Sequence, residues 1–416
     1  MRGAGGLRPY LSERRGRPGD SPMIARFLLC LFLSATFLLN ADAAPSAQDE
    51  AKQIEKDLRR IQLPEGFSIS LYALVPHART LAIGPRGEAI FVGTDASRIH
   101  VLIPGGERAA SVETFAADAP FVIPHGLCFD AEGTLFVVEQ NRISSFASAE
   151  SDWRRLAWKD ARSLAPQGGL IPVAEQSANH TTRICRVGPD GKLYVSLGQP
   201  YNVTPRDKLE LYERIGMGGI IRMNRDGSGR EVFARGVRNS VGMDFDPADG
   251  TLWFTDNQVD RMGDDTPPGE LNRAPRAGLH FGFPWYGGGH VRTYEYSRDT
   301  PPEGGVFPQV EEAPHAADLG MIFYRGSAFP PYYRGGIFSA QHGSWDRTMP
   351  VGARVMFTRV GPEGKRGVSE PFAEGWNNGD PQYLGRPVDV AELPDGSLLV
   401  TDDQNGAIYR IVYRAP

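Results

Sequence analysis

The sequence lacks the features that mark membrane-spanning, haem-carrying and nucleic-acid-binding proteins. Beyond its first 40 residues, no apolar run reaches the roughly 20 residues that a membrane-spanning helix needs. The formal net charge of −5 over 416 residues offers no basic excess for a nucleic-acid partner. A Cys-x-x-Cys-His haem-attachment motif is also absent. We therefore expect neither an integral membrane protein nor a nucleic-acid-binding one.

Cysteine is scarce: the chain has three. Cys30 lies in the apolar N-terminal run, whereas Cys128 and Cys185 lie in expected strands of neighbouring repeats, one position out of step with each other. A disulfide between these two remains open, but we expect two buried thiols instead. Cysteine chemistry is not the expected function.

The first 43 residues read as a leader and signal peptide. Phe27 to Leu39 is apolar, follows Arg26 and precedes Ala41-Asp42-Ala43, which has small residues at the two positions that a signal peptidase reads. We expect cleavage near Ala43 and a periplasmic or secreted protein. A membrane anchor is the less favoured alternative, because the run is short for a bilayer.

No long helical period follows the leader. Residues 44–62 form a charged lead-in that is compatible with a helix from Ala51 to Ile61. Residues 63–416 contain short, β-rich apolar runs separated by Gly, Pro, Asp and Asn, which predicts an all-β domain.

A glycine turn followed by an apolar strand occurs six times. The first copy is one residue out of register with the others, and the six begin at Gly87, Gly133, Gly191, Gly250, Gly335 and Gly396. Six four-stranded units of this kind predict a six-bladed β-propeller with a central channel, because ring closure removes exposed strand edges. The last strand, Ile408 to Tyr413, could pair with the strand that starts at Phe67 and latch the ring.

Polar side chains gather at the expected heads of the innermost strands. They are His125, His180, Arg183, Arg238, Asn239, His315 and Arg386. In a propeller these heads lie at one mouth of the channel. The crowding of cationic and polar groups predicts an anionic or oxygen-rich ligand on the axis.

Longer motifs give the chain a resemblance to a known family. The stretches that carry it are Gly236-Val237-Arg238-Asn239, Leu252 to Asn257, Gly263-Asp264-Asp265, Glu270-Leu271-Asn272, Phe281 to Pro284, His342 to Trp345 and Gly385-Arg386-Pro387. Together they resemble the soluble quinoprotein sugar dehydrogenases that use pyrroloquinoline quinone (PQQ), in particular the sorbosone-dehydrogenase-like branch. The resemblance implies oxidation of a sugar or related alcohol or aldehyde, with electrons passed on to an external acceptor.

The resemblance also implies roles for individual residues. His180 stands at the place of the catalytic histidine, and histidine suits a base because its unperturbed pKa is about 6.5. Arg238 and Asn239 match the pair that contacts the quinone. The further cofactor contacts that it implies are Arg386, Arg347, His125 and Arg183. A packing histidine, a surface arginine and a structural salt bridge of Arg183 are the competing interpretations.

Calcium is a second implied cofactor. The resemblance assigns the metal to backbone carbonyls of the segment containing Gly282 and Pro284, and hard cations prefer several oxygen ligands. An acidic group just before this segment braces the loop, binds a second calcium or simply forms turns. Its members are Asp256, Asp264, Asp265 and Glu270.

Departures from the family pattern keep two other functions open. Asn179 stands beside His180 where the family often has an acid, and Asp346 replaces an asparagine. A calcium-dependent propeller hydrolase or lactonase would need acids from several blades, and a non-enzymatic binding propeller would need no base. Four aromatic residues near the expected mouth could stack on a sugar face or pack between blades: Tyr201, Trp285, Tyr286 and Trp345.

Overall fold

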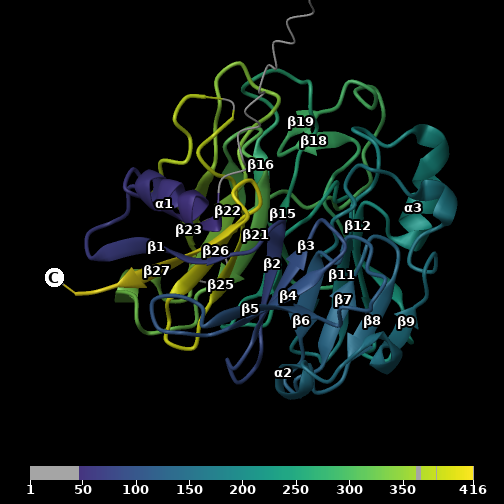
Figure 1. Ribbon diagram of the computed structural model, residues 1–416. Helices are drawn as coiled ribbons and strands as arrows, with labels where there is room; N and C mark the ends of the chain where they lie inside the picture. The colour runs from purple at the N-terminus through teal and green to yellow at the C-terminus, as the bar shows by residue number, and fades with distance from the viewer. Residues whose placement is uncertain (1–45, 362–366, 381, 416) are drawn as a thin grey trace, which may run out of the picture. The chain divides into compact units, whose positions relative to one another are not determined.

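A computed structural model describes residues 46–361, 367–380 and 382–415 (Figure 1). The predicted leader and signal peptide, residues 1–43, lie outside these described residues. Within them, no helix combines the length and apolar character needed to cross a bilayer.

The six glycine turns form as predicted. Each glycine has a positive φ, between 71° and 81°, and each turn leads into the second strand of a blade. Glycine adopts this left-handed backbone without steric cost, whereas other residues rarely do. The repeated glycine is therefore a backbone requirement of the hairpin.

The strands form six blades, described here from the innermost strand outwards. Blade 1 has β2 (Ala78–Ile83), β3 (Ile90–Thr94), β4 (Ile99–Ile103) and β5 (Ser111–Phe115); blade 2 has β6 (Gly126–Phe129), β7 (Leu135–Val138), β8 (Ile143–Phe146) and β9 (Arg162–Ala165). Blade 3 has β10 (Cys185–Val187), β11 (Leu193–Leu197), β12 (Gly219–Met223) and β13 (Glu231–Arg235), with β17 (Leu279–His280) parallel to β13.

The remaining blades follow the same antiparallel pattern. Blade 4 has β14 (Met243–Phe245), β15 (Leu252–Asp256), β16 (Gly269–Ala274) and β20 (Val310–Glu312); blade 5 has β21 (Asp318–Phe323), β22 (Ile337–Gln341), β23 (Arg354–Arg359) and β24 (Val368–Glu374). Blade 6 has β25 (Pro387–Glu392), β26 (Leu398–Asp402), β27 (Ala407–Tyr413) and β1 (Phe67–Leu74). A separate hairpin has β18 (Tyr286–Gly288) and β19 (Val291–Arg292).

The innermost strands close a ring. Each of β2, β6, β10, β14, β21 and β25 contacts the next, and β25 contacts β2 again. The predicted latch also forms, because β1 pairs with β27 from Phe67 opposite Tyr413 to Leu74 opposite Ala407. The six-bladed propeller is thus confirmed, with the first strand of the domain completing its last blade.

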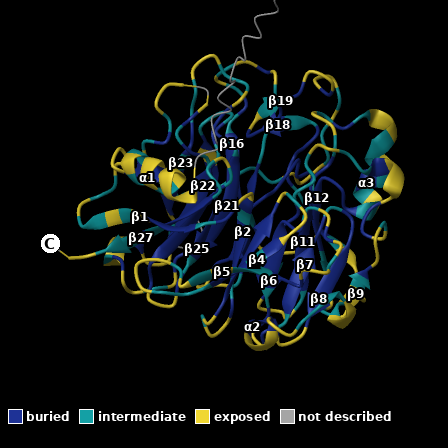
Figure 2. Cartoon of the chain, in the orientation of Figure 1, coloured by how far each residue is buried: buried dark blue, intermediate teal, exposed yellow. Residues whose placement is uncertain are grey.

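Apolar contacts between neighbouring blades form the core. The blade strands are largely buried, whereas many connecting turns are exposed (Figure 2). Trp253 of blade 4 packs edge-on against Phe323 of blade 5, with ring centroids 6.0 Å apart. Such aromatic pairs add to the stabilisation from burial alone.

Helices are few and short in the described part of the chain. They are α1 (Ala47–Leu58), α2 (Ala149–Asp152) and α3 (Leu209–Ile215), with single 3₁₀ turns η1 (Trp158–Asp160), η2 (Val173–Glu175), η3 (Arg206–Lys208) and η4 (Pro331–Tyr333). Helix α1 begins earlier than predicted because Ser46 caps it, accepting the backbone N–H of Asp49. The chain leaves α1 to pair Gln62 with Glu374.

The expectation of two buried thiols was wrong: Cys128 and Cys185 form a disulfide. The two residues lie on β6 and β10, the neighbouring innermost strands of blades 2 and 3, with Cα atoms 5.7 Å apart. In the repeat alignment the two cysteines are offset by one residue. Strands β6 and β10 are also shifted along their length relative to one another, and this shift brings the sulfurs together. The disulfide therefore links two blades across the inner ring.

We expect the Cys128→Ser and Cys185→Ser variants to lower the free energy of unfolding by about 2–4 kcal/mol, the usual contribution of a native disulfide. Urea unfolding of the oxidised wild type and of each variant measures the difference. The double variant is the control and should be no less stable than either single variant. Superimposable unfolding curves for wild type and variants would contradict this role.

Candidate active site

The heads of the innermost strands and the residues that follow the second strands meet at one mouth of the channel. Hydrogen bonds between blades connect them, joining Thr80 to His125, Asn257 to Asp318, His342 to Asp403 and Arg79 to Asp403. The strand heads thus occupy the same end of the ring, as the repeat pattern predicts.

A cavity of about 190 Å³ opens at this mouth between blades 3, 4 and 5. Its lining residues are His180, Arg238, Asn239, Asn257, Gln258, Asp260, Gly269, His315, Ala316, Ala317, Asp318 and Trp345. Four of the predicted rim residues are among them: His180, Arg238, Asn239 and His315. We call this the axial cavity.

Arg238 and Asn239 are held by the carboxylate of Asp256. Its oxygens accept the backbone N–H groups of Arg238 at 2.9 Å and of Asn239 at 2.7 Å. The side-chain oxygen of Asn239 is buried and has no hydrogen-bond partner among the described residues. Since a buried amide oxygen is costly to leave unpaired, the Asn239 amide has hydrogen-bonding capacity to offer a ligand.

The Arg238 guanidinium is buried and nearly saturated. It donates four hydrogen bonds: two to Asn202, one to the Asn257 carbonyl and one to Asp260 at 2.9 Å. Burial lowers the pKa of Arg238, while Asp260 and Asp256 act in the opposite direction. With five N–H groups in all, the guanidinium retains one donor and its charge for a ligand in the axial cavity.

His180 is presented as a neutral imidazole with one free nitrogen. Its Nδ1 lies 2.5 Å from the Gln199 carbonyl oxygen. Because a carbonyl only accepts, Nδ1 carries the proton and Nε2 carries the lone pair. Burial lowers the pKa of His180 to about 3, with Arg238 and Arg183 contributing further. The imidazole therefore stays neutral throughout the physiological pH range.

Arg183 positions His180 and does not line the axial cavity. Its guanidinium donates to the carbonyls of His180 at 2.8 Å, Gly198 at 3.0 Å and Gln140 at 3.3 Å. Burial lowers the pKa of Arg183 to about 10. Gly198 leaves room for Asn239 and His180, because a Cβ there would lie 2.3 Å from the side-chain oxygen of Asn239 and 3.0 Å from the Cβ of His180.

Three other predicted cofactor contacts lie outside the axial cavity lining. His125 is buried and its Nδ1 donates to the Arg183 carbonyl at 2.8 Å. Arg386 donates to the carbonyls of His342 and Gly343, and Arg347 donates to the Asp264 carbonyl. The structure thus shows these side chains engaged with protein groups.

The segment assigned to calcium also lies outside the lining. The Gly282 carbonyl accepts the backbone N–H of Tyr286 at 3.0 Å, and the Pro284 carbonyl accepts the Thr293 hydroxyl at 2.6 Å. Gly282 lines a different pocket, which includes His280 and Phe307.

The predicted acidic group separates into two parts. Asp256 and Glu270 are paired across β15 and β16 and are buried, whereas Asp264 and Asp265 lie in the loop that contacts Arg347. Burial raises the pKa of both Asp256 and Glu270, and the charge of Asp256 raises that of Glu270 further. The buried pair therefore retains a proton above the usual range of carboxyl groups.

Of the aromatic candidates, Trp345 lines the axial cavity and is 67 % exposed. Trp285 packs against His280 and Tyr296, and Tyr286 packs against Phe307. Tyr201 stacks with Tyr212. Only Trp345 combines an open face with a place in the lining.

Sequence reasoning missed the residues that follow the second strand of blade 4. Asn257, Gln258 and Asp260 line the axial cavity, just after β15 ends at Asp256. A signal was available: in an antiparallel hairpin, the end of the second strand lies beside the head of the first. The same rule explains the place of Trp345, which follows β22 and was expected near the mouth.

The fold and the site together define a class of protein. It is a six-bladed propeller in which an arginine and a histidine line a cavity at the mouth of the channel. Residues 141–344 match the family model described as glucose/sorbosone dehydrogenase, which confirms the predicted resemblance. An uncharacterized protein of Borreliella burgdorferi is 36% identical over 247 residues, covering 59% of this chain and 63% of that protein.

Solved structures share the fold at lower identity. The calcium structure of a Trichoderma reesei enzyme of carbohydrate-active family AA12 has a TM-score of 0.71 and 19% identity, covering 85% of this chain and 97% of that one. The PQQ domain of Coprinopsis cinerea pyranose dehydrogenase, in its holo form, has a TM-score of 0.68 and 18% identity, covering 85% and 97%. The apo form of Escherichia coli soluble aldose sugar dehydrogenase has a TM-score of 0.60 and 17% identity, covering 84% and 100%.

We expect Glu270→Gln to flatten the pH dependence of stability. A carboxyl group whose pKa is raised in the folded state stabilises the fold at acid pH, and this contribution is lost as the pH rises through the raised value. Glutamine mimics the protonated acid, and rotation of the Asn272 amide would offer it that residue's unpaired oxygen. The free energy of unfolding, measured from pH 5 to 9, should therefore fall less in the variant than in wild type.

The exposed Glu303→Gln variant is the control and should follow wild type. An equal slope for Glu270→Gln and wild type would show that the buried pair does not share a proton in this range.

Proposed function

We propose that this protein is a PQQ-dependent dehydrogenase that oxidises a hydroxyl-bearing carbon of a sugar or related alcohol or aldehyde. The observation that carries the proposal is the axial cavity, in which a histidine with a free Nε2 lies beside a buried arginine. The match of residues 141–344 to the glucose/sorbosone dehydrogenase family supports it.

The residues around the axial cavity fit an anionic, planar cofactor. Arg238 keeps a charge and one N–H donor, Asn239 lines the axial cavity with an amide whose NH₂ can donate, and Trp345 offers an open aromatic face. These three residues would hold the quinone by charge, hydrogen bonding and stacking. When bound, the quinone supplies an acceptor for the hydride that leaves the substrate carbon.

His180 would take the proton in this reaction. As hydride leaves the carbon, the hydroxyl proton moves to Nε2 and a carbonyl forms on the substrate, which loses two electrons. The Gln199 carbonyl keeps Nδ1 protonated, so the base does not depend on a tautomer shift. An anionic ligand would offset the effect of Arg238 and raise the His180 pKa above its low value in the free protein.

The Gly282 and Pro284 carbonyls do not belong to the lining of the axial cavity, and each already accepts one hydrogen bond from the protein. We therefore assign no step to calcium bound there.

A metal-dependent hydrolase or lactonase is the second candidate. The sequence placed mainly His and Arg at the mouth, but the structure adds Asp260 and Asp318 to the axial cavity and Asp346 close by. Such an enzyme needs acids from several blades, and these acids come from blades 4 and 5. This candidate would turn over without the quinone.

Export and an external electron acceptor are part of the proposal. The apolar run after Arg26 supports export, and so does the Cys128–Cys185 disulfide, since disulfides persist in oxidising compartments. The absence of a haem-attachment motif supports a separate acceptor molecule.

Reconstitution tests the proposed activity. Apo-protein is incubated with PQQ and Ca²⁺, and reduction of an artificial dye is followed with a panel of aldoses, while lactone hydrolysis is followed with Ca²⁺ or Mn²⁺ but without PQQ. We expect PQQ-dependent dye reduction with at least one sugar. Lactone hydrolysis without PQQ, and no dye reduction, would establish the second candidate instead.

His180→Ala should lower the rate of dye reduction by about 10²–10⁴-fold, the usual contribution of a general base. PQQ binding, measured by quenching of tryptophan fluorescence, should remain near wild type. His77→Asn is the control, because His77 is exposed, hydrogen-bonds to Asp95 outside the axial cavity and has a positive φ that asparagine tolerates. An active His180→Ala enzyme would remove the base assignment.

A further inference from the structure

We propose that Asp260, His315 and Asp346 form a binding site for a divalent transition metal, of the Mn²⁺ or Zn²⁺ class, at the rim of the axial cavity. The site requires only side chains of this chain, so it does not depend on the quinone.

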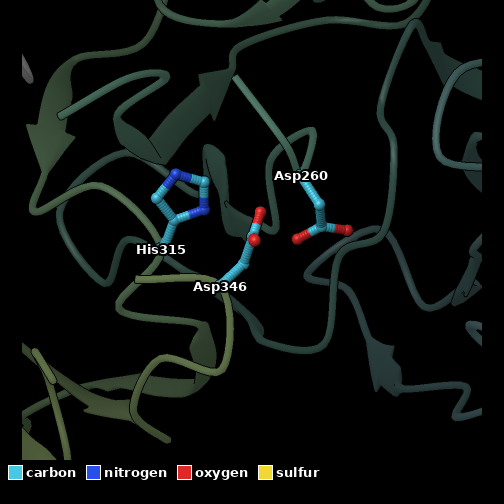
Figure 3. Close-up of side chains that lie close together, drawn as sticks. All are labelled: Asp260, His315 and Asp346. Carbon is cyan, nitrogen blue, oxygen red and sulfur yellow. The ribbon is translucent and has the colours of Figure 1, made fainter. Parts of the chain in front are cut away.

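Three separate segments bring the ligands together. Asp260 follows β15, His315 precedes β21 and Asp346 follows β22, and their donor atoms all lie within 4.8 Å of one another. Figure 3 shows the imidazole and the two carboxylates grouped around a common space. Three donors spaced evenly at about 2.1 Å from one metal lie at most about 3.6 Å apart, so donors that start within 4.8 Å of one another need side-chain movements of less than about 1 Å.

His315 is fixed in the tautomer that binds metal. Its Nε2 lies 2.8 Å from the Gly263 carbonyl oxygen and 3.0 Å from that of Thr266. Both partners only accept, so Nε2 carries the proton and Nδ1 carries the lone pair. Nδ1, the ring nitrogen nearest the chain, is on the side of the two aspartates (Figure 3). Metal-ligating histidines usually donate their other N–H to a carbonyl in this way.

Each carboxylate keeps an oxygen for the metal. Asp260 Oδ2 accepts from the Arg238 guanidinium at 2.9 Å, and Asp346 Oδ2 accepts the Arg261 backbone N–H at 2.5 Å. These bonds orient the side chains. Both are accepted by Oδ2, so Oδ1 of each aspartate takes no part in them and can face a metal. Two carboxylates beside one guanidinium leave a net negative charge, which favours a cation.

The ligand set distinguishes among metals. Calcium prefers six to eight oxygen ligands, whereas imidazole nitrogen favours zinc, iron, copper and nickel, and carboxylates also suit manganese. One nitrogen and two oxygens therefore favour a transition metal over the calcium expected from the sequence resemblance. Three protein ligands also leave positions open, as in catalytic metal sites. Because Asp260 and His315 line the axial cavity, the open coordination positions would face a ligand bound in that cavity.

Metal binding to the quinone-free protein tests the proposal. Full-length protein is treated with EDTA, freed of chelator and titrated with Mn²⁺, and the loss of the free-ion EPR signal gives bound metal per chain. We expect one saturable equivalent, displaced by Zn²⁺ and only weakly by Ca²⁺. Electron spin echo modulation should show coupling to one imidazole nitrogen.

Two variants separate coordination from folding. Asp346→Asn keeps the shape of the side chain, and His315→Asn suits the positive φ of 62° at this position, which asparagine tolerates. Both should weaken Mn²⁺ binding by at least about tenfold, since loss of even an outer-shell partner costs 10–100-fold. Thermal unfolding confirms that each variant is folded, and the nitrogen coupling should disappear in His315→Asn.

His77→Asn is the matched control, because His77 and Asp95 form another histidine–aspartate pair away from the axial cavity and His77 has a similar positive φ of 61°. It should bind Mn²⁺ like wild type. Absence of saturable binding, a preference for Ca²⁺, or unchanged binding in both folded ligand variants would overturn the site. A failure of PQQ reconstitution would not affect this result, so the two proposals fail independently.

Discussion

The carboxylate of Asp256 fixes the two residues around which the axial cavity is built. It stands at the end of β15 and accepts the backbone N–H groups of Arg238 and Asn239, in the loop before β14. Because these strands are antiparallel neighbours, the end of one lies beside the head of the other, and the carboxylate bridges them. Being buried, these amides have no water to replace a lost acceptor, so the loop is confined to one conformation.

The residues on either side of Asp256 connect the same strand to the next blade. The Thr255 hydroxyl donates to the Leu319 carbonyl at 2.7 Å, and the Asn257 amide donates to the Asp318 carbonyl at 2.9 Å. Successive residues of a strand point to opposite faces, so one short stretch can hold its own hairpin and the neighbouring blade at once. The closed ring then limits how far blades 4 and 5 can separate. This keeps the cavity-lining residues of the two blades at fixed positions relative to one another.

The fold was largely predictable because its main constraint is local. Each hairpin needs a glycine with positive φ, and six such glycines appear in the sequence before apolar strands. The disulfide was not predictable in the same way. Whether Cys128 meets Cys185 depends on the stagger between two blades, and alignment of the repeats does not contain that stagger.

The candidate site was predicted in part. The strand-head rule correctly brought His180, Arg238, Asn239 and His315 to one cavity, because it identifies which end of the ring each residue occupies. It does not say whether a side chain is already engaged with a neighbouring carbonyl, as Arg386 is with His342. It also omitted the ends of the second strands, and so missed Asp260.

The charges in the axial cavity are mixed, which changes how a ligand would be held. The sequence suggested a cationic mouth, but Arg238 is paired with Asp260 at 2.9 Å, so an anion entering the axial cavity would compete with that carboxylate. A cation held by Asp260 would draw on the same carboxylate and leave more of the guanidinium charge for the anion. Binding of the two would then be mutually favourable, and by linkage each would strengthen the other to the same degree. Asp260 thus gives a physical reason for a metal and an anionic cofactor to share one cavity, whichever of them binds first.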